Sequence, residues 1–175
     1  MRLLLVNAVE DPGEPEARML RVARHLRDQG WAITVTSPGE GALQDAGFPW
    51  VKLDIGGPGH GEGARAVASW PRALRLGQRF DAVYLNSTVC GRLLPALRGT
   101  RTVLHVHDPV DRIPRHWYRA DVVIADGTAV AERLDGLPVH ALKPPPGGDG
   151  AALGAYALAV EALLFDPGAR TRPAG

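Results

Sequence analysis

The feature of this sequence that most limits its fold is a series of short apolar runs separated by segments with helical spacing. Each run is rich in Val, Leu and Ile and has the length of a strand that is buried on both faces. Seven candidate strands follow along the chain: Arg2–Val6, Ala32–Thr36, Trp50–Leu53, Ala82–Leu85, Thr102–Val106, Val122–Ala125 and Val139–Leu142. Because these runs alternate with helical segments, the sequence predicts a doubly wound α/β fold with a mainly parallel sheet of about seven strands and helices on both faces.

The helical segments can be placed from their apolar spacing. After the first strand, one face carries Met19, Val22, Ala23 and Leu26, and four arginines are expected on the solvent side: Arg18, Arg21, Arg24 and Arg27. A second helical stretch, Ala64–Gln78, contains Pro71, which lacks a backbone N–H, so we expect two short helices there. Further helices are expected after Ser87, which can cap a first turn, and over Ala129–Leu134.

A change in composition after residue 143 divides the chain. Residues 1–143 are expected to form one Rossmann-like domain, and the Pro- and Gly-rich residues 144–150 to form a linker. Residues 151–165 form an apolar helix that is expected to pack back on the domain, and residues 166–175 are expected to fray.

Composition and missing motifs exclude several classes of protein. The net charge is only +1, which gives no reason to expect binding to nucleic acid. The single cysteine, Cys90, excludes an internal disulfide and suits the cytoplasm. The apolar run Leu3–Val6 is too short to span a membrane, so no transmembrane segment is expected and peripheral attachment stays open. The chain has no glycine-rich dinucleotide fingerprint and no P-loop, which argues against a dehydrogenase or an ATPase.

The most distinctive candidate site lies where the fifth predicted strand ends, since ligands of doubly wound sheets bind beyond the carboxyl ends of strands. His105 and His107 share one face of that strand, and Asp108 follows. A metal site needs more ligands than these. The further candidates, at irregular spacing, are Asp111, His116 and Asp126. We therefore expect no metal, with one histidine packed and hydrogen-bonded and the other lining a pocket.

Four segments in order resemble the N-terminal half of a GT-B glycosyltransferase, most closely the retaining family-4 enzymes. They are Arg24–Val35, Phe80–Ser87, Val103–Pro109 and Ala120–Leu134. The resemblance implies a Rossmann-like acceptor domain that faces a second Rossmann-like domain holding a nucleotide sugar. Only the helix of residues 151–165, which resembles the family's C-terminal helix that crosses back, follows residue 150 before the tail. The sequence thus resembles a GT-B protein without its donor domain.

The resemblance also implies roles for individual residues. His107 resembles the histidine beside the reacting sugar and is the expected catalytic residue. Gly13 resembles the glycine-rich turn that approaches the donor phosphates, although Glu14 stands where the family usually has a second glycine. Asn86 and Ser87 resemble acceptor-side residues. The expected substrate-binding set is Gly13, Asn86, Ser87, Asp108 and Asp126.

Three functions are compatible with these features. The first is the acceptor-binding half of a retaining GT-B enzyme, which transfers a hexosyl group only with a separate donor-binding partner. In that function a nucleotide sugar is a co-substrate, no cofactor is tightly bound, and the acceptor is a sugar or is linked to a lipid. The second is a non-catalytic binding or scaffolding module, and the third is a metal-dependent hydrolase that uses His105, His107 and Asp108.

The partner is expected to be a donor-binding protein or a second copy of the chain. Three aromatic residues are expected to line the exposed apolar face that it covers: Trp70, Trp117 and Tyr118.

Overall fold

The structure, a computed structural model, describes residues 1–57, 59, 62–145 and 150–165. Most of the expected linker, residues 146–149, and the whole of the expected frayed tail, residues 166–175, lie outside the described residues.

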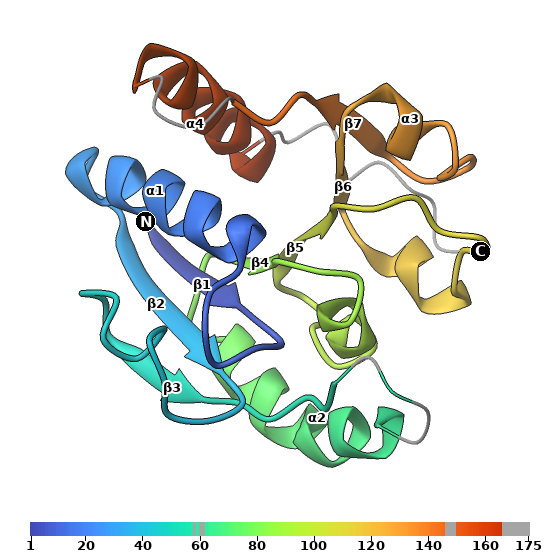
Figure 1. The fold of residues 1–175 in the computed structure, drawn as a ribbon. Coiled ribbons are helices and arrows are strands. Elements are labelled where there is room, and N and C mark those ends of the chain that lie inside the picture. The colour runs from blue at the N-terminus through green and yellow to red at the C-terminus, as the bar shows by residue number, and fades with distance from the viewer. Residues whose placement is uncertain (58, 60–61, 146–149, 166–175) are drawn as a thin grey trace.

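All seven expected strands form, and they make one sheet in the order β3-β2-β1-β4-β5-β6-β7 with every neighbouring pair parallel (Figure 1). The strands are β1 (Arg2–Val6), β2 (Ala32–Ser37), β3 (Trp50–Lys52), β4 (Ala82–Leu85), β5 (Arg101–Val106), β6 (Val122–Asp126) and β7 (Val139–Leu142). The predicted doubly wound α/β fold is therefore confirmed. The strand order reverses beside β1, where β4 lies on the side opposite β2, and ligands of such sheets bind at this switch point.

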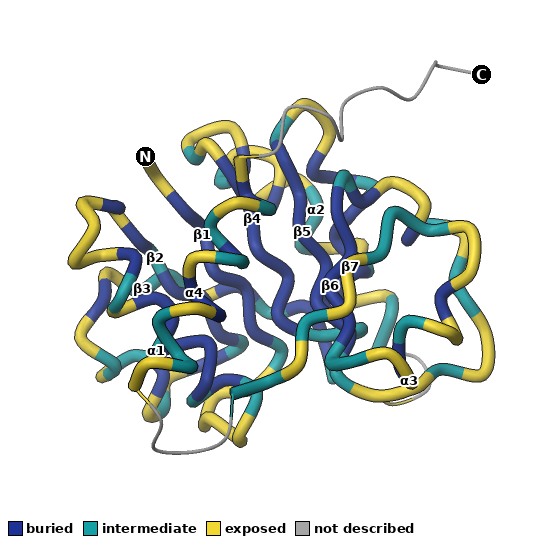
Figure 2. Tube along the Cα trace, turned by 90° about the horizontal axis from the view of Figure 1, so that it is seen from above, coloured by how far each residue is buried: buried dark blue, intermediate teal, exposed yellow. Residues whose placement is uncertain are grey.

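Helices bury both faces of the sheet, so the strands form the continuous buried centre of the molecule (Figure 2). Alternate side chains of β1 enter two separate cores. Leu3 and Leu5 pack in the core beneath α1 (Glu14–Asp28), whereas Leu4 and Val6 pack in the core beneath α2 (Gly63–Gly77). Because both faces are covered, the ends of the strands are the places that remain for hydrophilic side chains.

Helix α1 forms as an amphipathic helix with its predicted apolar face buried, and Gly30 follows its end with a positive φ of 92°. The backbone N–H of Gly13 donates to Oε2 of Glu16 at 3.0 Å, which fixes the start of the helix. One assignment on this helix is wrong: Arg18, expected on the solvent side, is only 7% exposed.

Helix α2 is continuous, so the expected division at Pro71 is wrong. Pro71 lies on the exposed side of the helix, and so does Val67, whose carbonyl loses its helical partner because proline has no N–H. Water can solvate that carbonyl, while Ala66 and Ala73 keep the opposite face packed in the core.

The connections after β4, β5 and β6 contain only short helices. These are η1 (Cys90–Leu93), η2 (Arg115–Arg119) and α3 (Thr128–Ala131), the first two of them 3₁₀ helices. Ser87 caps the turn before η1 as predicted, since its Oγ accepts the backbone N–H of Cys90 at 3.3 Å. Helix α3 is shorter than the predicted Ala129–Leu134.

The last helix, α4 (Gly150–Phe165), lies against α1 on one face of the sheet (Figure 1). Tyr156, Ala157, Val160 and Leu164 are buried in the core beneath α1. Nε1 of Trp31 donates a hydrogen bond to Oε1 of Glu161 at 2.9 Å. No helix in the described part of the chain is long and apolar enough to cross a membrane.

The expected apolar face of Trp70, Trp117 and Tyr118 does not form. Trp117 is only 2% exposed because it packs in the core beneath α2, and half-buried Trp70 donates its Nε1–H to the carbonyl of Arg92 at 3.1 Å. Of these three residues, Tyr118 alone is exposed.

The burial of α4 predicts that it stabilises the domain. Val160→Ala removes two methyl groups from a side chain that is 0% exposed and should lower the free energy of unfolding by about 1–3 kcal/mol. The matched control Leu158→Ala, at a position 57% exposed, should change it by less than about 0.5 kcal/mol. Denaturant titration measures both. Ending the chain at Gly150 should lower the melting temperature by several degrees or more, and an unchanged melting temperature would contradict this role for α4.

Candidate functional site

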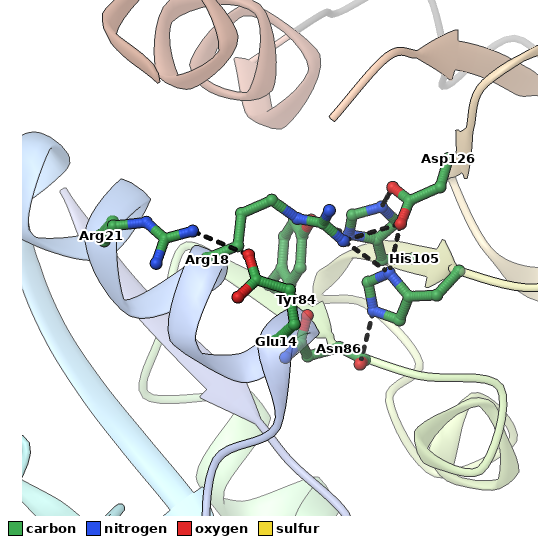
Figure 3. Close-up of polar contacts among 8 residues, drawn as sticks. Glu14, Arg18, Arg21, Tyr84, Asn86, His105 and Asp126 are labelled. Carbon is green, nitrogen blue, oxygen red and sulfur yellow. Dashed lines mark hydrogen bonds and ion pairs between the residues drawn. The ribbon is translucent and has the colours of Figure 1, made fainter. Parts of the chain in front are cut away.

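Polar side chains gather at the carboxyl ends of β4, β5 and β6 (Figure 3). Another lies at the end of β1, on the other side of the switch point. Asn7 follows β1, Asn86 follows β4, His107 follows β5, and Asp126 is the last residue of β6. Asn7 and Asn86 are buried, and the side chains of His107 and Asp126 are each 10% exposed. Four strands thus bring polar residues at their carboxyl ends into one network.

The carboxylate of Asp126 is the centre of this network. Its Oδ1 lies 2.7 Å from Nε2 of His105, and its Oδ2 lies 3.0 Å from Nδ1 of His107. Oδ2 also accepts a hydrogen bond from Nη2 of Arg18 at 2.7 Å, and the Arg18 side chain is only 8% exposed. One carboxylate therefore ties β5, β6 and α1 together.

Asp126 is ionised in this environment. Its burial opposes ionisation, but the hydrogen bonds from His105 and His107 outweigh burial and hold the pKa of the carboxyl well below its usual value. The ion pair with Arg18 compensates the negative charge that burial would otherwise leave unpaired.

His105 is a packed histidine with both nitrogens hydrogen-bonded. Because a carboxylate only accepts, Nε2 carries the proton that it shares with Asp126, and Nδ1 accepts the hydroxyl proton of Tyr84 at 2.6 Å. Burial of the ring lowers the pKa of His105 to about 4, and burial also raises the pKa of Tyr84 well above its usual value. Both groups are therefore neutral near pH 7.

His107 is held between two acceptors. Its Nε2 lies 3.0 Å from the backbone carbonyl of Asn86, which fixes a proton on Nε2. Its Nδ1 faces both Asp126 and, at 3.3 Å, Nη2 of Arg18. A doubly protonated ring donates to Asp126, whereas a neutral ring accepts from Arg18. In either state a ligand hydroxyl reaches Nε2 only by replacing the carbonyl of Asn86.

The side chain of Asn86 is turned into the protein. Its Nδ2 donates to Oδ1 of Asn7 at 2.9 Å, and Nδ2 of Asn7 donates to the carbonyl of Thr36 at 3.2 Å. Asn86 therefore joins the ends of β1, β2 and β4, and it reaches the site through its backbone carbonyl.

The structure brings together three of the residues predicted from the sequence, His107, Asn86 and Asp126, and it separates three others from them. Gly13 is exposed at the start of α1, and the Ser87 hydroxyl is engaged with Cys90. Asp108 is exposed beyond β5.

Sequence reasoning missed Arg18 and Tyr84 as members of the network. Tyr84 lies within an apolar strand and resembles an ordinary core residue. Arg18 precedes Val22 by one helical turn, and this spacing placed it on the buried stripe of α1. That signal was present in the sequence, but the run of arginines at every third position obscured it.

His105, His107 and Asp126 also form a group whose possible ligand atoms lie within 4.8 Å of one another. The hydrolase hypothesis chose the wrong carboxylate, because Asp126 and not Asp108 joins the two histidines. Asp111 and His116 are likewise outside this group. The guanidinium of Arg18 already supplies a positive charge to Asp126 at hydrogen-bond distance, so a metal ion would have to compete with Arg18 for this carboxylate.

Two cavities lie at the same edge of the sheet. One, of about 440 Å³, is lined beyond β1, β2 and β3 by Ala8, Val9, Glu10, Asp11, Pro38, Asp54, Gly56, Gly57 and Arg65. The other, of about 280 Å³, is lined in part by Thr88 and Val89, which come after Asn86, and by Val110, which comes after His107. One cavity therefore lies beyond β1, β2 and β3, and the other lies beyond β4 and β5.

The parallel sheet with helices on both faces is the fold of one half of a GT-B glycosyltransferase. Residues 15–143 match the model of Glycosyltransferase Family 4, and the chain belongs to this family. No curated protein matches the sequence.

Solved structures share the fold at low identity. HepE of Anabaena, in complex with UDP and glucose, is 17% identical with a TM-score of 0.62 over 82% of this chain and 44% of its own. MurG of Acinetobacter baumannii is 21% identical with a TM-score of 0.63 over 83% of this chain and 46% of its own. This chain therefore spans less than half the length of either.

A third structure matches along almost its whole length. It is a piece of the sucrose-phosphate synthase of Thermosynechococcus elongatus, described by the residue ranges 27–220 and 406–426. It is 14% identical to this chain, with a TM-score of 0.64 over 94% of this chain and 97% of the piece.

The pKa values of the network predict how stability depends on pH. His105 takes up a proton at about pH 4 in the folded state and at about pH 6.5 in the unfolded state. Between these values the folded state binds fewer protons, so the free energy of unfolding should fall as the pH is lowered from 6.5 to 4. Asp126, whose pKa is depressed, should add its own loss only below about pH 4.

Urea titrations across this range test the assignment to His105. The variant His105→Gln should flatten the decrease between pH 6.5 and 4, whereas His140→Gln, at an exposed position on β7, should leave it unchanged. An equally steep decrease in both variants would show that other groups, such as half-buried His116, carry it.

The position of Arg18 predicts that the natural chain takes up no stoichiometric transition metal. Elemental analysis after purification without chelator should find far less than one zinc per chain. The variant Arg18→Ala, which removes the competing cation, should bind zinc more tightly. One zinc per natural chain that disappears in His107→Ala would contradict the prediction and favour a hydrolase.

Proposed function

We propose that the chain is the acceptor-binding half of a retaining GT-B glycosyltransferase, and that a separate donor-binding protein completes the active site. The observation that carries the proposal is the family match over residues 15–143 together with the direct passage from the last strand to α4. Strand β7 ends at Leu142 and α4 begins at Gly150, so residues 143–149 alone connect them.

The sucrose-phosphate synthase piece supports this reading of the connection. The piece has two ranges of residues with a gap of 221–405 between them, and this chain covers 97% of it. In this chain β7 and α4 follow one another without room for a Rossmann-like domain between them.

Glycosyl transfer places two demands on an active site. The acceptor hydroxyl has to be held in line with the reacting carbon, and the charge that develops on the leaving diphosphate has to be stabilised. The carboxyl edge of this sheet offers two cavities and a fixed imidazole for the first demand. The second demand falls on the partner, since Arg18, the cation of the network, is already paired with Asp126.

In this function His107 lies beside the reacting sugar. Asp126 and the carbonyl of Asn86 fix the plane of its ring, and the Nε2–H is the donor that a sugar hydroxyl or carbonyl group would take over from Asn86. Asp126 and Arg18 are positioning residues that act through His107. The co-substrate is a nucleotide sugar, in keeping with the UDP and glucose present with HepE.

A first prediction concerns the chain by itself. Calorimetry with UDP-glucose and GDP-mannose should show very weak binding or none, because most contacts to phosphate and base belong to the missing half. Binding in the low micromolar range by the purified chain would contradict the half-enzyme.

The decisive experiment is purification of the chain from its own cells together with the proteins bound to it. A donor-type Rossmann domain should co-purify in equal amount, and the pair should transfer labelled glucose from UDP-glucose while neither chain does so alone. In the pair, His107→Ala should reduce kcat on the order of 100-fold, and the exposed control His140→Ala should leave it unchanged. A pair without transfer, or a chain found only with copies of itself, would favour a scaffolding module.

A further inference from the structure

The smaller cavity at the carboxyl edge has an electropositive lining. Its walls come from the segments after β4 and β5 and from η2. The lining residues are Thr88, Val89, Arg92, Val110, Arg112, Pro114, His116 and Trp117. Two arginines and a histidine are present, and none of the described lining residues is acidic.

Arg92 is held in place from two sides. Its Nη1 donates to the carbonyl of Gly57 at 2.7 Å, and its own carbonyl accepts the Nε1–H of Trp70 at 3.1 Å. The side chain is therefore preorganised, and most of the five N–H donors of its guanidinium are left for another acceptor. Preorganisation lowers the entropy cost of binding a ligand there.

The two arginines at this cavity form no ion pair with a carboxylate in the described part of the chain. By contrast, Arg18 pairs with Asp126, and Arg65 pairs with Asp54 and Glu62. His116 responds to the same field: its pKa is lowered by burial and, in addition, by the charges of Arg92 and Arg119.

The other cavity at this edge has the opposite character. Three carboxylates line it, Glu10, Asp11 and Asp54. The one cation among its described lining residues, Arg65, lies 3.9 Å from a carboxylate oxygen of Asp54. An anion is repelled there and attracted to the smaller cavity. The two cavities therefore differ in the ligand charge that they accept.

We infer that the cavity lined by Arg92, Arg112 and His116 binds a phosphate monoester carried by the acceptor. A guanidinium matches the geometry of phosphate oxygens and donates two parallel hydrogen bonds to them. Thr88 and Val110 of the lining follow Asn86 and His107 closely in the chain, so a phosphate there would anchor the acceptor on the same side of the sheet edge as the reacting group. The inference rests on the proposed acceptor role and names the chemical class of the acceptor.

Binding to the full chain tests the inference directly. The probes are inorganic phosphate, glucose 6-phosphate, farnesyl phosphate and, as the uncharged control, glucose, each followed by NMR of the backbone amides. Glucose 6-phosphate or farnesyl phosphate should shift the amides of Thr88, Val89 and Arg92, and glucose should not. Tighter binding of farnesyl phosphate assigns the phosphate to a lipid-linked acceptor, and tighter binding of glucose 6-phosphate assigns it to a sugar phosphate.

Variants locate the binding. Arg92→Gln and Arg112→Gln should each weaken binding of the phosphate probes about tenfold, the loss of one charged contact. The control Arg75→Gln removes the same charge from an exposed position on α2 that does not line the cavity. Arg112 is exposed and makes no ion pair with a described carboxylate, so its loss does not endanger folding.

Two outcomes overturn the inference: no phosphate binding at any of these amides, or equal weakening in Arg75→Gln and the two cavity variants. Its failure is separable from that of the proposed function. A reconstituted pair that transfers sugar to uncharged acceptors alone leaves the half-enzyme intact and removes the phosphate site. Phosphate binding at Arg92 and Arg112 without sugar transfer in any reconstituted pair leaves the phosphate site intact and removes the half-enzyme.

Discussion

A parallel sheet that is covered on both faces leaves its strand ends as the place where polar groups can gather, and this constraint organises the whole molecule. Every neighbouring pair of strands is parallel, so all carboxyl ends lie at one edge. At that edge the charge of one carboxylate, Asp126, has to be compensated. His105 in β5, His107 just after β5 and Arg18 in α1 all contact Asp126 there. Compensation of one buried charge therefore also fixes α1, β5 and β6 relative to one another.

The same network sets the chemical character of the site. His105 is buried and neutral. Its Nε2 donates a hydrogen bond to Asp126, and its Nδ1 accepts one from Tyr84. His107 has one ring nitrogen toward Asp126 and Arg18 and the other toward the carbonyl of Asn86, where a ligand can compete. Arg18 occupies the position of a cation beside two imidazoles and a carboxylate. In the function that we propose, the oriented imidazole of His107, and not a metal-bound water, is the reactive group of the site.

Charge is distributed unequally along the edge, and the proposed functions use this distribution. Carboxylates surround the cavity beyond β1, β2 and β3, whereas Arg92 and Arg112 line the cavity beyond β4 and β5. Helix α4 lies away from both cavities, against α1, where it buries apolar side chains. The edge is thus left to ligands and to the proposed partner, while α4 contributes to the stability of the half-domain.

The sequence alone determined the seven strands, the amphipathic α1 and the helical character of α4, because apolar periodicity follows directly from which faces an element buries. It located His107 and Asp126 through the rule that ligands bind beyond strand ends. Tertiary structure decided what local rules could not. Pro71 stays within a helix because the carbonyl of Val67, which proline leaves without its helical partner, lies on the exposed side. Trp117 is buried because η2 packs on the second core. It also decided the partners of Asp126. Arg18 precedes Asp126 by 108 positions, and no local pattern encodes a contact between side chains so far apart in the chain, since only the packing of α1 against the sheet brings them together.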